Sequence, residues 1–218
     1  STETYWTDMG RIASQISSLQ TMRTPHLVSR EVYEESDGIG YVQMELIRGI
    51  SLDRLANSGI LEQVESHSSS DEWSRITDII FRLDKNHTAI QPGVVIHIMR
   101  HILRALEVLH EHGFAHADIK PANVMLDQMG NVKVIDYGRA VRLEEKLTIL
   151  LGTPHYMAPE LHQRSPNRAQ SDLYSVGILG IELLTGRRLF TVGHANTQFQ
   201  KILQFKKQSG SSLTHCLQ

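Results

Sequence analysis

Residues 116–123 read HADIKPAN, and residues 136–138 read DYG. Between them lie two runs rich in β-branched residues, at 123–126 and 132–135, which bracket the turn-forming sequence QMGN at 128–131. Two such runs around a short polar turn predict a β-hairpin. Both ends of the hairpin carry polar side chains, so we expect the chemistry of the chain to be concentrated here.

Apolar periodicity predicts a helix on each side of this hairpin. From residue 95 to residue 109, apolar side chains recur at helical spacing, and Gly113 can end that helix in a left-handed conformation. Farther along, Ser171 can cap a helix that continues to Gly186. This second helix is apolar nearly all round, which predicts burial at the centre of a helical lobe. A last, weaker helix is expected around residues 199–203.

The first third of the chain is expected to mix one helix with short strands. Residues 9–19 carry apolar side chains at spacings of three and four, which is typical of one helical face. Two strand-like runs at 27–33 and 41–47 are separated by a charged turn at 34–38, which indicates a second hairpin.

The composition excludes several classes of protein. The chain has 218 residues, with 40% hydrophobic and 21% charged residues, which excludes disorder as a whole. Its 22 Lys and Arg residues nearly balance 24 Asp and Glu residues, so no global basic field exists for nucleic acid or an anionic membrane. A single cysteine, Cys216, indicates a reducing compartment, and we expect the cytoplasm. No apolar run is long enough for a membrane segment.

Four motifs resemble those of the eukaryotic-type protein kinase superfamily, and of Ser/Thr protein kinase catalytic domains in particular. Residues 116–123 resemble the catalytic loop His-Arg-Asp-Leu-x-x-x-Asn, and residues 136–138 resemble Asp-Phe-Gly. The sequence GTPHYMAPE at 152–160 resembles the end of the activation segment, and SDLYSVG at 171–177 resembles the start of the central buried helix. Four motifs in this order are hard to match by chance.

The resemblance implies a protein-kinase-like α+β fold. Residues 1–50 would form a partial N-lobe, with one helix plus short antiparallel strands, and the hinge. Residues 51–218 would form a mainly α-helical C-lobe, in which residues 57–92 make an irregular surface excursion carrying a helix near residues 74–83. Relative to the complete domain, we expect both ends to be truncated and the last helices to be missing.

The resemblance also implies roles for five residues. Asp118 would accept the proton of the substrate hydroxyl, and Lys120 would neutralise the transferring phosphoryl group. Asn123 and Asp136 would hold Mg²⁺, which bridges the phosphates of ATP. Thr153 would contact the substrate, and together with Lys120 it resembles the Ser/Thr-specific branch.

The expected ATP site includes residues of the hinge as well. By resemblance, Met44 is the gatekeeper, and the backbone of Glu45 and Ile47 would meet the adenine edge. The other cofactor-binding residues expected from the family pattern are Lys120, Asn123 and Asp136.

Other parts of the family pattern are absent. The lysine that steadies the phosphates precedes the hinge in the family, but the first lysine here is Lys85. The glycine-rich loop is absent too. Gln15 stands where the glutamate that pairs with the missing lysine is expected. Ala117 replaces the arginine that binds a phosphorylated activation loop, which argues against that mode of switching.

Two functions therefore stay open at this point. The favoured one is a Ser/Thr protein kinase that transfers the ATP γ-phosphate to protein Ser/Thr hydroxyls in the full-length parent, with the fragment alone inactive. The alternative is a catalytically inactive pseudokinase scaffold that binds a protein partner. A small-molecule phosphotransferase is disfavoured by residues 153–160, which resemble a peptide-docking segment.

Three more residues have structural roles in the family pattern. We expect His116 to be a packed structural residue and Asp172 to be a buried acceptor for the backbone of the catalytic loop. Glu160 matches a glutamate whose arginine partner is missing here. It is therefore expected to be exposed or to pair with a substitute cation, of which Arg187 and Arg188 are the nearest in sequence.

Overall fold

The computed structural model describes residues 19, 22–37, 39–55, 58–84, 87–145, 152–190, 204, 206 and 208. Its helices are α2 (Leu52–Leu55), α3 (Ser58–His67), α4 (Ser70–Ile79), α5 (Pro92–Glu111), α6 (Pro159–His162) and α7 (Ala169–Thr185), with 3-10 turns at Pro121–Asn123 and Tyr137–Arg139. The strands are β1 (Arg30–Ser36), β2 (Ile39–Met44), β3 (Gly49–Ser51), β4 (Phe81–Asp84), β5 (His87–Ile90), β6 (Phe114–Ala115), β7 (Val124–Asp127), β8 (Val132–Val134) and β9 (Val141–Arg142).

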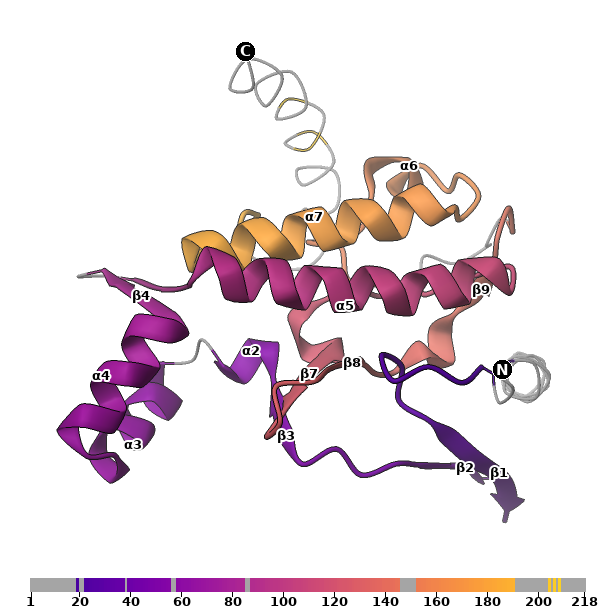
Figure 1. Ribbon diagram of the computed structural model, residues 1–218. Helices are drawn as coiled ribbons and strands as arrows, with labels where there is room; N and C mark the ends of the chain where they lie inside the picture. The colour runs from indigo at the N-terminus through magenta and orange to yellow at the C-terminus, as the bar shows by residue number, and fades with distance from the viewer. Residues whose placement is uncertain are drawn as a thin grey trace.

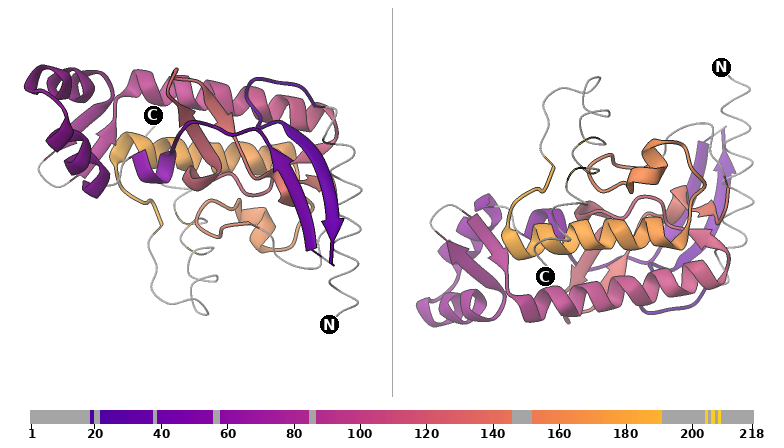
Figure 2. Two further views of the ribbon diagram at one scale, coloured as in Figure 1. Left: turned by 90° about the horizontal axis from the view of Figure 1, so that it is seen from below. Right: turned by 90° about the horizontal axis from the view of Figure 1, so that it is seen from above.

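Helices α5 and α7 form the centre of the molecule. They lie side by side, and β7 and β8 lie below them in Figure 1. Figure 2 shows the β1–β2 hairpin at one end of this pair, and α3 and α4 at the other. Residues from α5, α7, β7 and β8 share one apolar core, and the α5 members are Val95, Ile98, Ile102, Ala105, Leu106 and Leu109. The predicted α+β arrangement is thus confirmed.

Local sequence signals explain the ends of both long helices. The apolar stripe predicted over residues 95–109 lies within α5, and Gly113 follows it with φ 80°. Gly186 ends α7 in the left-handed conformation, with φ 65°. Glycine adopts positive φ without the steric penalty that a Cβ imposes, so these two helix ends follow directly from the sequence.

The central sheet is three-stranded and antiparallel, in the order β3–β7–β8. The predicted hairpin is confirmed, with Val124 opposite Val134. The chain before β1 joins the same sheet, because the Val28 N–H donates to the Val134 carbonyl at 3.0 Å and the Val134 N–H donates to the His26 carbonyl at 2.8 Å. A second predicted hairpin, around residues 34–38, is also confirmed as β1–β2.

Residues 57–92 are not the irregular excursion that their polar composition predicts. They contain α3, α4, β4 and β5. The Ser69 hydroxyl accepts from the Glu72 N–H, and the Glu72 carboxylate accepts from the Ser69 N–H, so a capping box starts α4. The Ser-x-x-Glu pattern is visible in the sequence and was the signal for this helix. The boundary between residues 1–50 and 51–218 stays a prediction.

The start of α7 also differs from expectation. Ser171 does not cap the helix, which begins two residues earlier, after Arg168. The Ser171 hydroxyl instead donates to the Glu160 carboxylate at 2.8 Å. The helix expected over residues 9–19 lies outside the described residues apart from Leu19, which is helical and buried, and the one around 199–203 lies wholly outside them. Within the described chain, no helix is long and apolar enough to cross a membrane.

Gly49 provides a test of the central sheet. A Cβ added there would lie 2.2 Å from the Leu126 carbonyl oxygen and 2.7 Å from the Asp127 Cα, which are backbone atoms of the paired strand. We expect Gly49→Ala to lower the free energy of unfolding by about 1–3 kcal/mol, the usual cost of overpacking. Denaturant unfolding measures this change.

The matched control is Gly93→Ala, in the first turn of α5, where an added Cβ meets nothing within 4 Å. This change should be neutral or stabilising, because alanine favours helix over glycine by about 1 kcal/mol. Equal stability of the two variants would contradict the β3–β7 register.

Candidate active site at the 116–123 loop

The loop is held by one carboxylate from the first turn of α7. Asp172, which is 2% exposed, accepts from the backbone N–H of His116 at 2.8 Å and from that of Ala117 at 3.0 Å. The expected role of Asp172 as a buried acceptor is confirmed. Ala117 has φ 64°, a left-handed conformation that alanine rarely adopts, so the loop depends on these two bonds. Gly152 (φ 104°) lies so close that a Cβ there would be 2.5 Å from the Ala117 carbonyl oxygen.

His116 connects the loop to the end of the hairpin. Its side chain is completely buried, so the expectation of a packed structural residue is confirmed. Nδ1 accepts from the Asp118 N–H at 3.3 Å, and Nε2 lies 3.2 Å from the Ile135 carbonyl, to which it must donate. These partners require the neutral tautomer with the proton on Nε2. Burial lowers the pKa of His116 below its ordinary value, against the opposing influence of Asp172, Asp118 and Asp136.

Four residues that the sequence singled out meet at the Asp118 carboxylate, which is 3% exposed. Oδ1 accepts from the Thr153 hydroxyl at 2.8 Å, and Oδ2 accepts from the Lys120 ammonium at 2.7 Å. The Asn123 amide donates to the Asp118 carbonyl at 2.8 Å and to Oδ2 at 3.3 Å. The Lys120 ammonium also lies 3.2 Å from the Thr153 hydroxyl. One buried acid, one ammonium, one hydroxyl and one amide thus form one connected network.

Asp136 lies at the other end of the hairpin and is exposed. It adopts the left-handed conformation, with φ 56°, and the Ile135 N–H before it donates to the Asn123 carbonyl at 2.9 Å. The next residue, Tyr137, is buried and donates its hydroxyl to the Val28 carbonyl at 2.7 Å. The backbone therefore fixes Asp136 beside Asn123. Carboxylate and amide oxygens are the hard donors that Mg²⁺ takes alongside phosphate oxygens, so this pair fits the ion.

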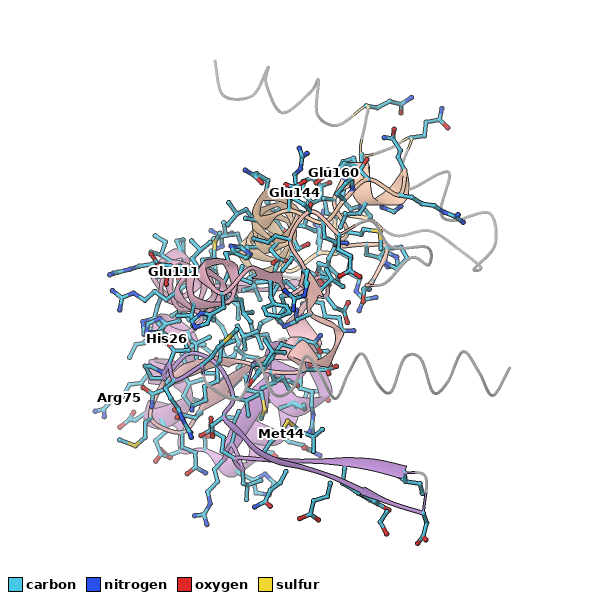
Figure 3. All side chains as sticks on the ribbon, turned by 90° about the vertical axis from the view of Figure 1, so that its right-hand side faces the viewer. His26, Met44, Arg75, Glu111, Glu144 and Glu160 are labelled. Carbon is cyan, nitrogen blue, oxygen red and sulfur yellow. The ribbon has the colours of Figure 1, made fainter. Side chains whose placement is uncertain are left out.

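The residues expected to form the hinge run from Met44, the last residue of β2, toward β3. Met44 is 47% exposed, and Figure 3 shows it where the β1–β2 hairpin joins the body of the protein. Ile47 is half-buried against the main core. The Glu45 carboxylate accepts from the Lys133 ammonium at 2.5 Å and from the Ser29 N–H at 2.9 Å. Burial opposes ionisation of Glu45, but these hydrogen bonds prevail and lower its pKa.

Glu160 is not exposed, as one alternative expected, and it does not pair with Arg188. Glu160 is half-buried, on the side of the protein opposite Met44 in Figure 3, and it accepts from the Ser171 hydroxyl. Arg188, one of the two cations expected beside it, lies 3.7 Å from Glu182 instead. The neutral hydroxyl of Ser171 satisfies the Glu160 oxygen without an arginine.

A groove of about 530 Å³ opens beside Lys120 and Thr153. Its walls include Tyr156 and Glu182, which no local sequence pattern connects. The Tyr156 hydroxyl donates to the Glu182 carboxylate at 2.6 Å, and burial raises the pKa of Tyr156, so the phenol keeps its proton. Glu182 was visible in the sequence as the one acid in the apolar part of α7, but its partner lies 26 residues away.

The neutral His116 predicts a pH dependence of stability. Because its folded pKa is lowered, the unfolded chain takes up the proton first as the pH falls through 6.5. Stability present above this pH is therefore lost below it. We expect His116 to account for a fall of up to about 1.4 kcal/mol in the free energy of unfolding between pH 7.5 and pH 5.5.

Denaturant unfolding of His116→Gln at the two pH values measures this contribution, since glutamine can accept and donate but does not titrate here. The variant should lose part of the pH dependence, whereas His112→Gln, at an exposed position after α5, should retain it. An unchanged pH dependence in His116→Gln would mean that His116 is not held neutral.

Comparison with known proteins agrees with this geometry. The family model for the protein kinase domain matches residues 2–214. The chain is 29% identical over 181 residues to serine/threonine-protein kinase PrkC of Bacillus subtilis, covering 81% of this chain and 24% of the relative. It is 28% identical over 183 residues to the probable serine/threonine-protein kinase PknB of Lactococcus lactis, covering 82% of this chain and 25% of the relative.

A third relative, serine/threonine-protein kinase STE20 of Eremothecium gossypii, is 35% identical over 118 residues, covering 53% of this chain and 12% of the relative. The chain thus spans a quarter or less of the length of these three relatives. The family match, by contrast, extends over nearly all of the chain and includes every motif of the network. The chain belongs to the protein kinase domain family.

Proposed function

We propose that the Asp118 network transfers the γ-phosphoryl group of ATP to a Ser or Thr hydroxyl of a protein substrate. The observation that carries this proposal is the buried Asp118 carboxylate, which accepts from Lys120 and Thr153 beside the groove. A positioned carboxylate next to an ammonium is what phosphoryl transfer needs from a protein, because the reaction depends on orientation and charge neutralisation.

In this mechanism, Asp118 orients the substrate hydroxyl and accepts its proton. Oδ1 already accepts from one hydroxyl, that of Thr153 at 2.8 Å, so the carboxylate can accept from an alcohol at this position. Lys120 lies 2.7 Å from the other oxygen and lines the groove, where its charge would offset that of the transferring group. Thr153 would contact the acceptor side of the substrate.

Asn123 and Asp136 would hold Mg²⁺ through their side-chain oxygens. The ion, when bound, neutralises charge on the phosphates. Burial of Asn123 and its bonds to Asp118 keep the amide in one orientation, and the bond between Ile135 and Asn123 keeps Asp136 next to it. Both residues would therefore be preorganised for the ion.

The adenine of ATP would contact the segment from Met44 to Ile47. The bond between Glu45 and Lys133 supports this assignment, because it directs the Glu45 side chain toward β8 and fixes the backbone of the segment. The single cysteine, Cys216, supports a reducing location such as the cytoplasm. The relatives named as serine/threonine-protein kinases support Ser and Thr as the acceptor residues.

Asp118→Asn tests the proposal in the intact protein. Asparagine keeps the size of the side chain but cannot accept the proton, so turnover should fall by roughly 10²–10⁴-fold. Initial rates with ATP, Mg²⁺ and a protein substrate measure the change, and circular dichroism checks that the variant is folded.

The control is Asp78→Asn, which removes the same charge at an exposed position in α4 and should leave turnover unchanged. Near-normal turnover in Asp118→Asn would remove the assignment of Asp118. A wild-type protein without turnover would contradict the kinase proposal itself and favour a scaffold.

A further inference from the structure

Lys206 is a buried cation outside the network described so far. Its side chain is 4% exposed. The ammonium nitrogen lies 2.6 Å from the Pro154 carbonyl, 2.5 Å from the Met157 carbonyl and 3.2 Å from His162 Nε2. An ammonium has three N–H donors, and here three acceptors face it. The site is thus completely coordinated by residues that lie 44 to 52 positions earlier in the chain.

The surroundings of Lys206 compensate in part for the burial of its charge. The nitrogen lies 5.1 Å from the centroid of the Phe190 ring and 5.6 Å from that of the Tyr174 ring, which are cation–π distances. Burial lowers the pKa of Lys206 to about 7, and the nearby Glu160 opposes this shift. Burial and the Lys206 charge also lower the pKa of His162 to about 4, which keeps its imidazole neutral and able to accept.

The two carbonyls belong to the turn that carries Thr153. Within this turn, the N–H groups of Tyr156 and Met157 both donate to the Thr153 carbonyl, at 3.0 Å and 3.1 Å. Lys206 binds the carbonyl of the residue after Thr153 and that of the last residue of the turn. The side chain of Thr153, in turn, donates to Asp118.

Apolar contacts alone hold this turn weakly. Met157 packs in a small cluster with Ala158 and Leu161, separate from the main core between α5 and α7. Tyr156 packs in another small cluster with Ile178 and Phe190. Few apolar side chains are buried here. The turn is held instead by hydrogen bonds: those of the ammonium, that of the Ser175 hydroxyl to the Tyr156 carbonyl at 2.9 Å, and that of the Tyr156 hydroxyl to Glu182.

We propose that Lys206 is a positioning residue that fixes the 153–157 turn through its carbonyls and so keeps the Thr153 hydroxyl on the Asp118 carboxylate. The proposal rests on the proposed function for its effect on catalysis. The effect on the turn itself does not depend on that function.

Hydrogen exchange in the 218-residue chain tests the effect on the turn. Lys206→Met keeps the length of the side chain but removes the ammonium. We expect the amides of Tyr156 and Met157 to exchange at least about 10-fold faster, while those of α5 stay unchanged, because local opening is governed by local contacts. Lys207→Met removes an equal charge at the next position. It should leave the exchange rates of the Tyr156 and Met157 amides and of the α5 amides unchanged.

Unchanged exchange at Tyr156 and Met157 in Lys206→Met would overturn the proposal. Acceleration that extends equally to α5 would also overturn it, since Lys206 would then support global stability only. If Lys206→Met does not fold, Lys206→Gln, which retains an amide donor, gives the same comparison.

A kinetic readout tests the link to Asp118. In the intact protein, Lys206→Met should raise KM for the protein substrate and lower kcat, with KM for ATP unchanged, because only the side of the site near Thr153 is displaced. If the substitution only reduced the number of folded molecules, kcat would fall and KM for the protein substrate would stay unchanged. That result would contradict the positioning role. Faster exchange without any wild-type turnover would uphold the effect on the turn and count against the proposed function instead.

Discussion

The Asp172 carboxylate holds the backbone on which the whole site is built. It comes from the first turn of α7 and accepts two N–H groups at the start of the 116–123 loop. Because α7 packs against α5 in the main core, the position of the loop is set by the two helices that share this core. Without this carboxylate, the buried His116 N–H and the partly buried Ala117 N–H would lose their partner, and the left-handed conformation of Ala117 would lose its support.

Beyond Asp172, a chain of hydrogen bonds connects the 116–123 loop to the β7–β8 hairpin. His116 connects the Asp118 amide to the Ile135 carbonyl, and Asn123 connects the Asp118 side chain to the Ile135 amide. The two ends of the hairpin are therefore joined in two ways, through the imidazole ring of His116 and through the backbone hydrogen bond between Ile135 and Asn123. Of the described non-glycine residues with a left-handed backbone, Ala117 and Asp136 lie next to these bonds and carry backbone strain there. This is where a preorganised site is expected to store it.

Sequence patterns predicted the structural features that depend on residues close together in the chain. The β7–β8 hairpin, α5 and the end of α7 follow from alternation, apolar periodicity and glycine, and the loop motif predicted the residues that meet at Asp118. Contacts between distant segments carried no such signal. The bond from Lys133 to Glu45 and the coordination of Lys206 join residues far apart in the chain, so neither has a local pattern. Helix α4 overlaps the helix expected near residues 74–83 but begins earlier, at Ser70, because the capping box of Ser69 and Glu72 sets its start.

Thr153 lies between two constraints of different physical kinds. On one side, Gly152 is pressed against the Ala117 carbonyl at a distance that excludes any side chain. On the other side, the Lys206 ammonium binds the carbonyl of Pro154. The steric contact at Gly152 limits how closely the turn can approach the 116–123 loop, but it cannot stop the turn from moving away. The bond from the Lys206 ammonium resists that movement. Both constraints are needed to keep the Thr153 hydroxyl at 2.8 Å from Asp118, because hydrogen bonds weaken steeply once distance and angle depart from their optimum.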